Sequence, residues 1–470
     1  MSRASLDIRD FSGGLVNKLD SNLIPDNASP DCSNVVSRVI GELETRSGQL
    51  TLNASGLSAP VQGLTAYYPG VVPTRYLVAV ANGVAYYWDS AAEEFVTLKT
   101  GLSTTNPVMF AGTVNYLVGA DGETPPWKWN GSVVSPLANA PSKGMMPILH
   151  KEKLFMVDAD DPSNLVWADS FQPEQWAGVN YQYVREGDGD DITALLRYIG
   201  ELFIFKRTCT YSLRGTSLDD FRLPGIDERI GCVGPRAVGQ HGLYIYSVGD
   251  WGLYRFNGMK YDNLSARIIP KLWDGVNKEY LHKAVVQVWK DYVFFSLPYG
   301  NATYNNLQLV FDTTSEQGAF WPWYGVNATC YTEFNREQET LLYAGDKDGF
   351  VKQQDIGTTD DTAPIVGYWQ GKQFDGGLSE YTKKAKRAYV ALSPGSTAVP
   401  DLSLSLDNGA FANTEYRRGD GMVKEYRITT NSKWRYLTPR LDFTAHGKVR
   451  SVMVPIKRIS NRPKVREVLP

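Results

Sequence analysis

Residues 76–88 read YLVAVANGVAYYW, a layout that recurs along the chain. It holds two apolar runs on either side of Asn82-Gly83, a dipeptide that favours a two-residue turn between antiparallel strands. A second stretch, residues 116–129, has the same layout around Asp121-Gly122. The layout returns at residues 154–167, 202–213, 243–256, 292–311 and 341–352. The sequence therefore predicts a series of β-hairpins.

The spacing of these hairpins is regular. Their start positions differ successively by 40, 38, 48, 41, 49 and 49 residues. Another short apolar run precedes each hairpin, as at residues 64–68, and a weaker strand follows most of them, as at residues 95–98. About four strands per unit of about 43 residues is typical of a β-propeller blade. We therefore predict an all-β protein with a β-propeller of six to eight blades over residues 61–360; the regular spacing disfavours a series of unrelated β-sandwiches.

Two segments lie outside the repeat. Residues 1–60 are polar and rich in turns, and we predict a lead-in that helps to close the ring between the first and last blades. From about residue 361 the composition changes, and residues 361–470 contain six or more short runs typical of strands. That number of strands is enough for a small C-terminal β-sandwich-like module.

The composition excludes several classes of protein. Of 470 residues, 43% are hydrophobic and 21% are charged, which rules out global disorder. The 12 Trp, 27 Tyr, 18 Phe, 43 Gly and 25 Pro favour short strands and tight turns over long helices. A net charge of −3 argues against a free-standing nucleic-acid-binding protein. Because no apolar run is long enough to cross a membrane and the N-terminus lacks a signal-peptide core, we expect cytoplasmic synthesis without membrane insertion.

Charge is divided unevenly along the chain. Residues 380–470 hold 18 Lys or Arg and 8 Asp or Glu, a balance of +10, so the remaining residues carry −13. A basic module on an acidic body predicts docking on a surface of opposite charge. We assign the candidate assembly or docking surface to two short basic runs, formed by Lys383, Lys384, Lys386, Arg387, Arg417 and Arg418. The alternative is a solvated edge strand that Lys and Arg keep soluble.

The sequence lacks the motifs of common catalytic and metal sites. Its four His have no metal-binding spacing, and it contains neither a phosphate-binding glycine loop nor a nucleophile elbow. The densest group of carboxylates, residues 186–191, lacks the spacing of a calcium loop and is interpreted as an acidic turn. The four Cys are far apart and are interpreted as structural thiols. We therefore predict no catalytic residue, no metal and no cofactor.

Aromatic residues alternate along single predicted strands. Trp127 and Trp129 flank one residue, as do Tyr254 and Phe256, and an Asn-Gly pair follows each group. Aromatics at alternate positions lie on one face of a strand, which is what packing between blades needs. A platform for stacking carbohydrate is the alternative interpretation.

Several phrases of the sequence also occur, in this order, in a known family. They are FSGGL at residues 11–15, LIPDN at residues 23–27, Asn34, a Gly41…Arg46-x-Gly48 element, and the long stretches 146–215 and 231–263. In these phrases the chain resembles the tail hub proteins of short-tailed bacteriophages, also called nozzle, tail tubular protein B or packaged-DNA stabilisation proteins. The resemblance covers roughly residues 11–356.

The resemblance implies a structural virion protein and not an enzyme. Members of that family assemble, typically as a six-fold ring, below the head-to-tail adaptor and continue the channel through which DNA leaves. They help to retain packaged DNA together with a plug or needle, and they anchor fibres or spikes. The partners implied for this chain are further copies of itself in a homohexamer, the adaptor, the fibre, spike or needle proteins, and double-stranded DNA in passing.

The charge balance suits a conduit, because each basic side chain paired with a phosphate would hold the DNA back. The implied location is the tail of the virion, after synthesis in the cytoplasm of the bacterial host. The alternative function is a receptor-binding or polysaccharide-degrading tail propeller. That alternative predicts a pocket with paired carboxylates and exposed aromatic residues.

Overall fold

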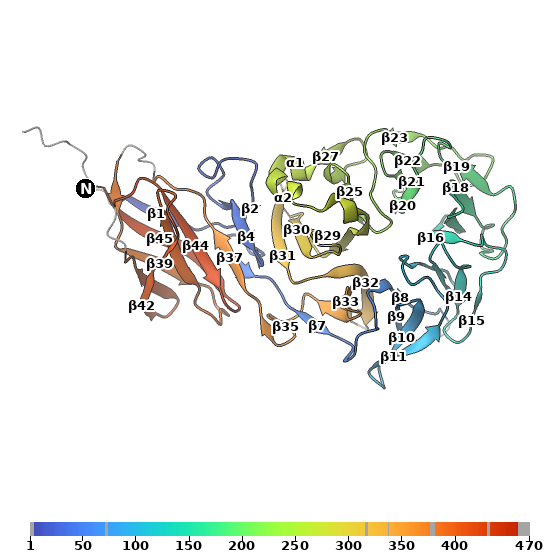
Figure 1. Ribbon diagram of the computed structural model, residues 1–470, viewed down its shortest axis with the longest axis horizontal. Coiled ribbons are helices and arrows are strands. Elements are labelled where there is room, and N and C mark those ends of the chain that lie inside the picture. The colour runs from blue at the N-terminus through green and yellow to red at the C-terminus, as the bar shows by residue number, and fades with distance from the viewer. Residues whose placement is uncertain are drawn as a thin grey trace, which may run out of the picture.

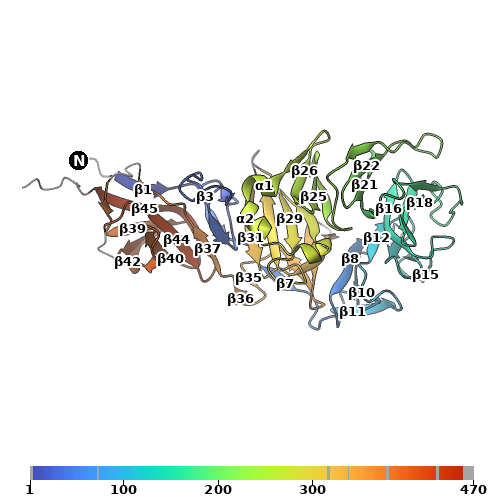
Figure 2. The same cartoon turned by 45° about the horizontal axis from the view of Figure 1, so that its top comes forward.

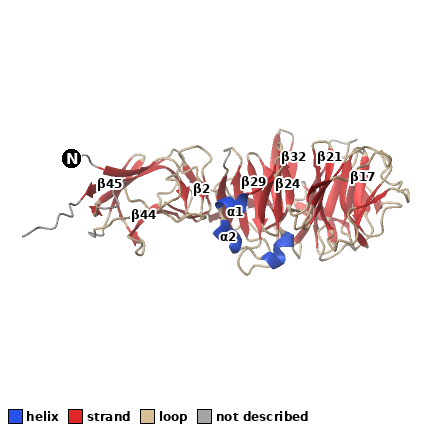
Figure 3. Cartoon of the chain, turned by 90° about the horizontal axis from the view of Figure 1, so that it is seen from above, coloured by secondary structure: helices blue, strands red, loops and turns tan. Residues whose placement is uncertain are grey.

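The computed structural model describes residues 4–70, 74–314, 318–336, 338–376, 381–429 and 433–458. This part of the chain is nearly all β-structure (Figure 3). Figure 1 shows two bodies side by side, a ring-like series of sheets and a smaller group of sheets that carries strands from near both ends of the chain. The same division is visible after rotation (Figure 2).

Six antiparallel four-stranded sheets follow one another along the chain, and the strands of each sheet pair in sequence order. The first three consist of β8 (Val61–Tyr67), β9 (Tyr76–Ala81), β10 (Val84–Asp89) and β11 (Glu94–Lys99); β12 (Met109–Gly112), β13 (Leu117–Ala120), β14 (Trp127–Trp129) and β15 (Val134–Pro136); and β16 (Gly144–His150), β17 (Lys153–Asp158), β18 (Asp161–Trp167) and β19 (Tyr181–Tyr183). The next three consist of β20 (Ile192–Tyr198), β21 (Glu201–Lys206), β22 (Thr210–Leu213) and β23 (Gly225–Asp227); β24 (Val238–His241), β25 (Tyr244–Gly249), β26 (Gly252–Phe256) and β27 (Tyr261–Asn263); and β28 (Val285–Trp289), β29 (Tyr292–Leu297), β30 (Leu307–Asp312) and β31 (Ala319–Tyr324).

A seventh sheet combines strands from two distant parts of the chain. Its first three strands are β32 (Ala328–Arg336), β33 (Glu339–Asp346) and β34 (Val351–Gln354). The next is β7 (Gln49–Thr51), which lies antiparallel to β34. Two short strands, β35 (Thr359–Asp360) and β36 (Ala363–Pro364), continue the sheet beyond β7.

The seven sheets stand in a ring-like order (Figure 1). The first strand of each sheet contacts the first strand of the next, from β8 through β12, β16, β20, β24 and β28 to β32. β32 in turn contacts β8. The all-β, propeller-like fold predicted from the hairpin repeat is therefore confirmed.

The first hairpin forms as the sequence predicts. Asn82 and Gly83 join β9 to β10 with φ angles of 50° and 73°. These positive values fit the turn that an Asn-Gly pair forms between twisted strands. Valine and alanine side chains of β9 are fully buried on both faces of the strand. The sheet is thus packed on both sides, as a blade between two neighbours is.

The alternating aromatic residues belong to the core. Trp127, Trp129, Tyr254 and Phe256 are all buried. Trp129 packs against three tyrosines of the first sheet, with ring centroids 4.7–5.8 Å apart. This confirms the interpretation of these residues as packing between neighbouring sheets. All four Cys are likewise buried and free, which confirms their interpretation as structural thiols.

The side chain of Arg236 joins four sheets near the centre of the ring-like body. Arg236 directly precedes the fifth sheet. Its guanidinium donates to the carbonyl oxygens of Gln62 in β8, Val108 beside β12 at 2.9 Å, and Thr329 in β32 at 3.2 Å. One cation therefore satisfies carbonyl groups from the first, second and seventh sheets, and it lies where the first strands of the sheets converge.

The variant Arg236→Met should lower the free energy of unfolding by about 2–4 kcal/mol, because three carbonyl groups lose a charged donor. Urea denaturation followed by tryptophan fluorescence measures this. Arg229→Met, at an exposed arginine, is the matched control and should change stability by less than about 0.5 kcal/mol. An Arg236→Met variant as stable as this control would contradict the bridging role.

The second body consists of two sheets that share one hydrophobic core. The larger sheet contains β42 (Glu415–Asp420), β43 (Val423–Arg427), β39 (Arg387–Leu392), β45 (Lys448–Arg458), β6 (Leu43–Thr45) and β5 (Val35–Val36), with β1 (Ala4–Ile8) and β38 (Lys383–Lys384) also paired to β45. The smaller sheet contains β4 (Asp31–Ser33), β37 (Gly367–Gln370), β44 (Leu437–Phe443), β40 (Asp401–Leu406) and β41 (Ala412–Asn413). We call this body the sandwich.

Short elements complete the described chain. A small parallel pair is formed by β2 (Gly14–Leu15) and β3 (Ala28–Ser29). Two short helices, α1 (Leu264–Ile268) and α2 (Pro270–Asp274), and the 3₁₀ helix η1 (Lys278–Lys283) connect the fifth sheet to the sixth.

Residues 1–60 do not form a separate lead-in. In the described part of this segment, β1, β4, β5 and β6 pair with strands of the sandwich, and β7 pairs with the seventh sheet. Phe11 is fully buried and meets the ring of Trp369 in β37 edge-on at 5.0 Å. Short strands from this segment therefore join sheets in both bodies. β7 pairs with the seventh sheet directly before the first sheet begins at β8, which fits the predicted role of residues 1–60 in closing the ring.

Arg46 fixes the sandwich to the ring-like body. Its guanidinium donates to both carboxylate oxygens of Asp360, at 2.9 and 2.6 Å, and to the carbonyl of Tyr324 in β31 at 3.2 Å. The side chain of Arg46 is only 2% exposed. Asn34 strengthens the joint, because its Oδ1 accepts from the backbone N–H of Tyr324 at 2.7 Å. The buried ion pair thus ties the end of β6 to the sixth and seventh sheets.

The variant Arg46→Met should lower the free energy of unfolding by about 3–5 kcal/mol, because it leaves the Asp360 carboxylate without its partner in a largely buried place. Chemical denaturation measures this difference. Arg9→Met removes an ion pair at the surface, with Asp7, and should leave stability nearly unchanged. Equal stabilities of the two variants would show that the Arg46 pair does not hold the joint.

Candidate functional site

The predicted docking residue Lys383 is buried and does not belong to an exposed surface. Its side chain is fully buried, its Nζ donates to the carbonyl of Arg435 at 2.8 Å, and its ammonium lies 5.5 Å from the ring centre of Trp434. Burial lowers the pKa of Lys383, and Asp375 and Asp407 partly offset this. The prediction that Lys383 belongs to an exposed docking surface is therefore wrong, because its side chain is buried in the sandwich.

Three of the other predicted residues are exposed. Lys386 and Arg387 lie at the start of β39, and Arg417 lies at a bulge in the edge strand β42. Arg387 forms an ion pair with Glu425 of β43 at 3.2 Å. Lys384 is half-buried and paired in β38, and the side chain of Arg418 lies outside the described residues.

The hairpin of β42 and β43 also exposes apolar side chains. Tyr416, Met422 and Val423 are 47–52% exposed, close in sequence to Arg417. Aromatic, methionine and arginine side chains together are typical of protein interfaces. We call Lys386, Arg387, Arg417 and these three apolar residues the β42 edge. It is smaller and more mixed in character than the basic surface predicted from the sequence.

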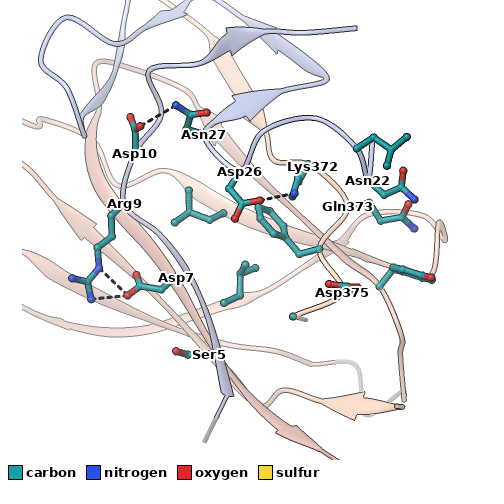
Figure 4. A pocket seen from close by; sticks show the side chains of 16 residues that line it. Ser5, Asp7, Arg9, Asp10, Asn22, Asp26, Asn27, Lys372, Gln373 and Asp375 are labelled. Carbon is teal, nitrogen blue, oxygen red and sulfur yellow. Dashed lines mark hydrogen bonds and ion pairs between the residues drawn. The ribbon is translucent and has the colours of Figure 1, made fainter. Parts of the chain in front are cut away.

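A separate open groove of about 850 Å³ lies where the first residues of the described chain meet the sandwich (Figure 4). Three segments line it: residues 5–10, residues 22–27 and residues 372–376, with Tyr436. This groove could not be predicted from the sequence, because its walls come from segments separated by about 350 residues.

The charged side chains of the groove are engaged with one another. Asp7 pairs with Arg9 at 2.6 Å, and Asp26 pairs with Lys372 at 2.5 Å (Figure 4). Burial would raise the pKa of Asp10, but hydrogen bonds from Ser12 and Asn27 hold that pKa below its usual value. With Asp375 the groove contains four carboxylates against two cations. This arrangement favours a basic or polar ligand.

The acidic loop 186–191 is anchored to the fourth sheet. Asp188 accepts from Lys206 Nζ at 2.7 Å, and Lys206 is fully buried. Asp190 accepts from the backbone N–H groups of Arg207 and Thr208 at 3.0 and 2.9 Å. These bonds fit the interpretation of the loop as an acidic turn. Among the described residues, no group of three or more His, Cys, Asp or Glu could hold a metal ion.

His150 is buried in β16, and its Nε2 has no hydrogen-bond partner among the described residues. Burial, with smaller contributions from Lys151 and Arg197, lowers the pKa of His150 from 6.5 to about 4. The folded state therefore binds this proton less readily than the unfolded state. The stability associated with the neutral imidazole is present above pH 6.5 and is lost as the pH falls toward 4.

We predict that His150→Phe makes stability less dependent on pH between 6.5 and 4, because the variant has no imidazole to protonate. Urea denaturation midpoints at several pH values in this window test the prediction. An unchanged slope of stability against pH in the variant would show that His150 does not contribute to acid sensitivity.

No family model matches the chain, and a search of curated proteins finds no match. In the described part of the chain, no helix is both long and apolar enough to cross a membrane.

Proposed function

We propose that the protein is a structural component of a bacteriophage tail, a hub or nozzle subunit built on a closed seven-bladed propeller. In this proposal, several copies, typically six, form a ring below the head-to-tail adaptor. The ring continues the DNA exit channel, helps to retain packaged DNA and anchors fibres, spikes or a needle. The proposal includes no enzymatic activity and places the protein in the virion tail.

One observation supports this proposal: the N-terminal phrases that resemble those of tail hub proteins, residues 11–15 and 41–48, lie at the joint between the two bodies. Phe11 packs on Trp369 in the sandwich, and a Cβ on Gly14 would come within 2.8 Å of the Phe320 carbonyl in β31. Arg46 forms the buried ion pair described above, and a Cβ on Gly48 would lie only 1.8 Å from the Thr359 carbonyl. Such close contacts suit a rigid wall element.

The position of Arg236 bears on the path of the DNA. Its side chain joins the first strands of four sheets near the centre of the propeller-like body. In our proposal DNA therefore passes through the middle of the assembled ring and not through any single propeller. The acidic balance of residues 1–379 suits such a wall, because DNA slides most easily past a surface that does not bind phosphates.

Imaging of the purified protein by negative-stain electron microscopy tests the proposal. We expect closed rings with a central opening wide enough for a DNA duplex, since that DNA must pass. Particles that remain single at high concentration, together with cleavage of a bacterial polysaccharide, would instead favour a receptor-binding or polysaccharide-degrading tail protein.

The β42 edge is the surface we expect to dock on an acidic neighbour. The triple variant Lys386→Glu, Arg387→Glu and Arg417→Glu should lower the fraction of assembled protein about tenfold, because it reverses the charge at the contact. Sedimentation velocity measures the assembled fraction. The melting temperature should stay within about 3 °C, since exposed ion pairs contribute little.

A matched control reverses three exposed basic residues of the propeller-like body, Arg229, Lys260 and Lys271. It changes the net charge equally and should leave assembly close to that of the natural protein. Equal loss of assembly in both triple variants would mean that net charge, and not the β42 edge, controls association.

A further inference from the structure

In the described part of the chain, strand β1 pairs along one edge only, and its residues 5–8 line the acidic groove. β1 pairs with β45 along this edge, from Ala4 opposite Ile456 to Ile8 opposite Val452. Leu6 and Ile8 are buried, while Ser5 and Asp7 are exposed. Within the described residues, no other strand pairs with β1 and none of its backbone groups bonds to a further segment. The backbone donors and acceptors along the second edge of β1 thus have no partner among the described residues.

An unpaired strand edge is a template for a further strand. The groove offers contacts for the side chains of such a strand. Leu23, 68% exposed, offers an apolar contact on the opposite wall. Asp7 and Asp26 pair with Arg9 and Lys372, but the lining as a whole still carries two more acidic than basic side chains. The chemistry selects an extended segment with basic side chains and some apolar ones.

The chain itself contains a segment of this kind. Residues 459–470, ISNRPKVREVLP, follow β45 directly and lie outside the described residues. Arg462, Lys464 and Arg466 occupy alternate positions, so all three would lie on one face of an extended strand. Twelve residues in extended form reach about 40 Å. The segment therefore has the charge, the spacing and the length to add to a strand edge on a neighbouring molecule.

We propose that the free edge of β1 binds residues 459–470 of a second copy of this chain as an added β-strand. The geometry favours a second copy over the same one. β45 occupies the paired edge of β1, so a segment leaving the end of β45 would have to pass around β1 to reach the free edge of its own copy. A neighbouring copy meets no such obstacle.

This contact joins two different surfaces, the groove of one copy and residues 459–470 of the next. Such heterologous contacts repeat from copy to copy and close into a ring when the rotation permits. The inference rests on the proposed ring for its biological setting, but strand exchange between copies is measurable whether or not the assemblies close.

The experiment uses the full chain in two variant forms. In the first, Arg462, Lys464 and Arg466 are changed to Glu, which disables the donor segment and leaves the groove intact. In the second, Asp7 and Asp26 are changed to Lys, which disables the groove and leaves the donor segment intact. Each variant alone should self-associate at least about tenfold more weakly than the natural chain, because the charges at the contact are reversed.

Mixing the two variants brings the unaltered donor segment of the second together with the unaltered groove of the first, and should restore association measured by sedimentation velocity. A labelled peptide of residues 459–470 should bind the donor-disabled chain, and its Arg462→Glu, Lys464→Glu, Arg466→Glu form should bind about tenfold more weakly by fluorescence anisotropy. The matched control Glu93→Lys with Glu94→Lys, at an exposed turn of the first sheet, should leave association unchanged.

Absence of peptide binding to the donor-disabled chain would overturn the inference, even if rings still form. Binding of the peptide without any self-association of the natural chain would also overturn it, since the segment would then serve its own copy. Exchange-dependent association that yields open chains and no rings would support the inference and contradict the proposed ring.

Discussion

Three residues near the start of the chain, Gln49–Thr51, pair with Val351–Gln354 and so add a strand to the seventh sheet. This pairing brings together segments about 300 residues apart, and Asp360 is aligned beside Gln49 in the same sheet. The entropic cost of closing a loop grows slowly with its length, by about 0.6 kcal/mol per doubling. A loop of this length is therefore thermodynamically feasible, although it forms slowly. The Arg46–Asp360 ion pair lies at the same place and fixes the sandwich to the closing sheet.

The hairpin repeat could be predicted because each hairpin carries its signal locally. The apolar alternation of residues 76–88 and the Asn82-Gly83 turn specify two strands without reference to the rest of the chain. The strands near the N-terminus could not be predicted in this way. β4, β5 and β6 contain two or three residues each, and β1 pairs with residues some 450 positions away. Only tertiary packing makes such segments into strands, so their contribution to the sandwich was missed.

The candidate site could likewise be predicted only in part, because it depends on tertiary packing. A run of basic residues indicates charge, but it does not indicate which side chain points inward, and Lys383 lies under Trp434 while Lys386 and Arg387 reach the surface. The groove beside β1 has walls from three distant segments. Arg236 carried no pattern that distinguished it from other arginines, and the Gly41…Arg46-x-Gly48 element indicated no bridging role for Arg46. Both act by bridging groups that the fold brings together.

The central structural claim is that the N-terminal segment makes one cooperative unit of the propeller-like body and the sandwich. Hydrogen–deuterium exchange with mass spectrometry across a urea series tests this most directly. The account predicts that peptides covering β7, β33 and β44 become exchange-competent in a single shared transition. Loss of protection in β44 at a lower urea concentration than in β33, with β7 unprotected throughout, would contradict it.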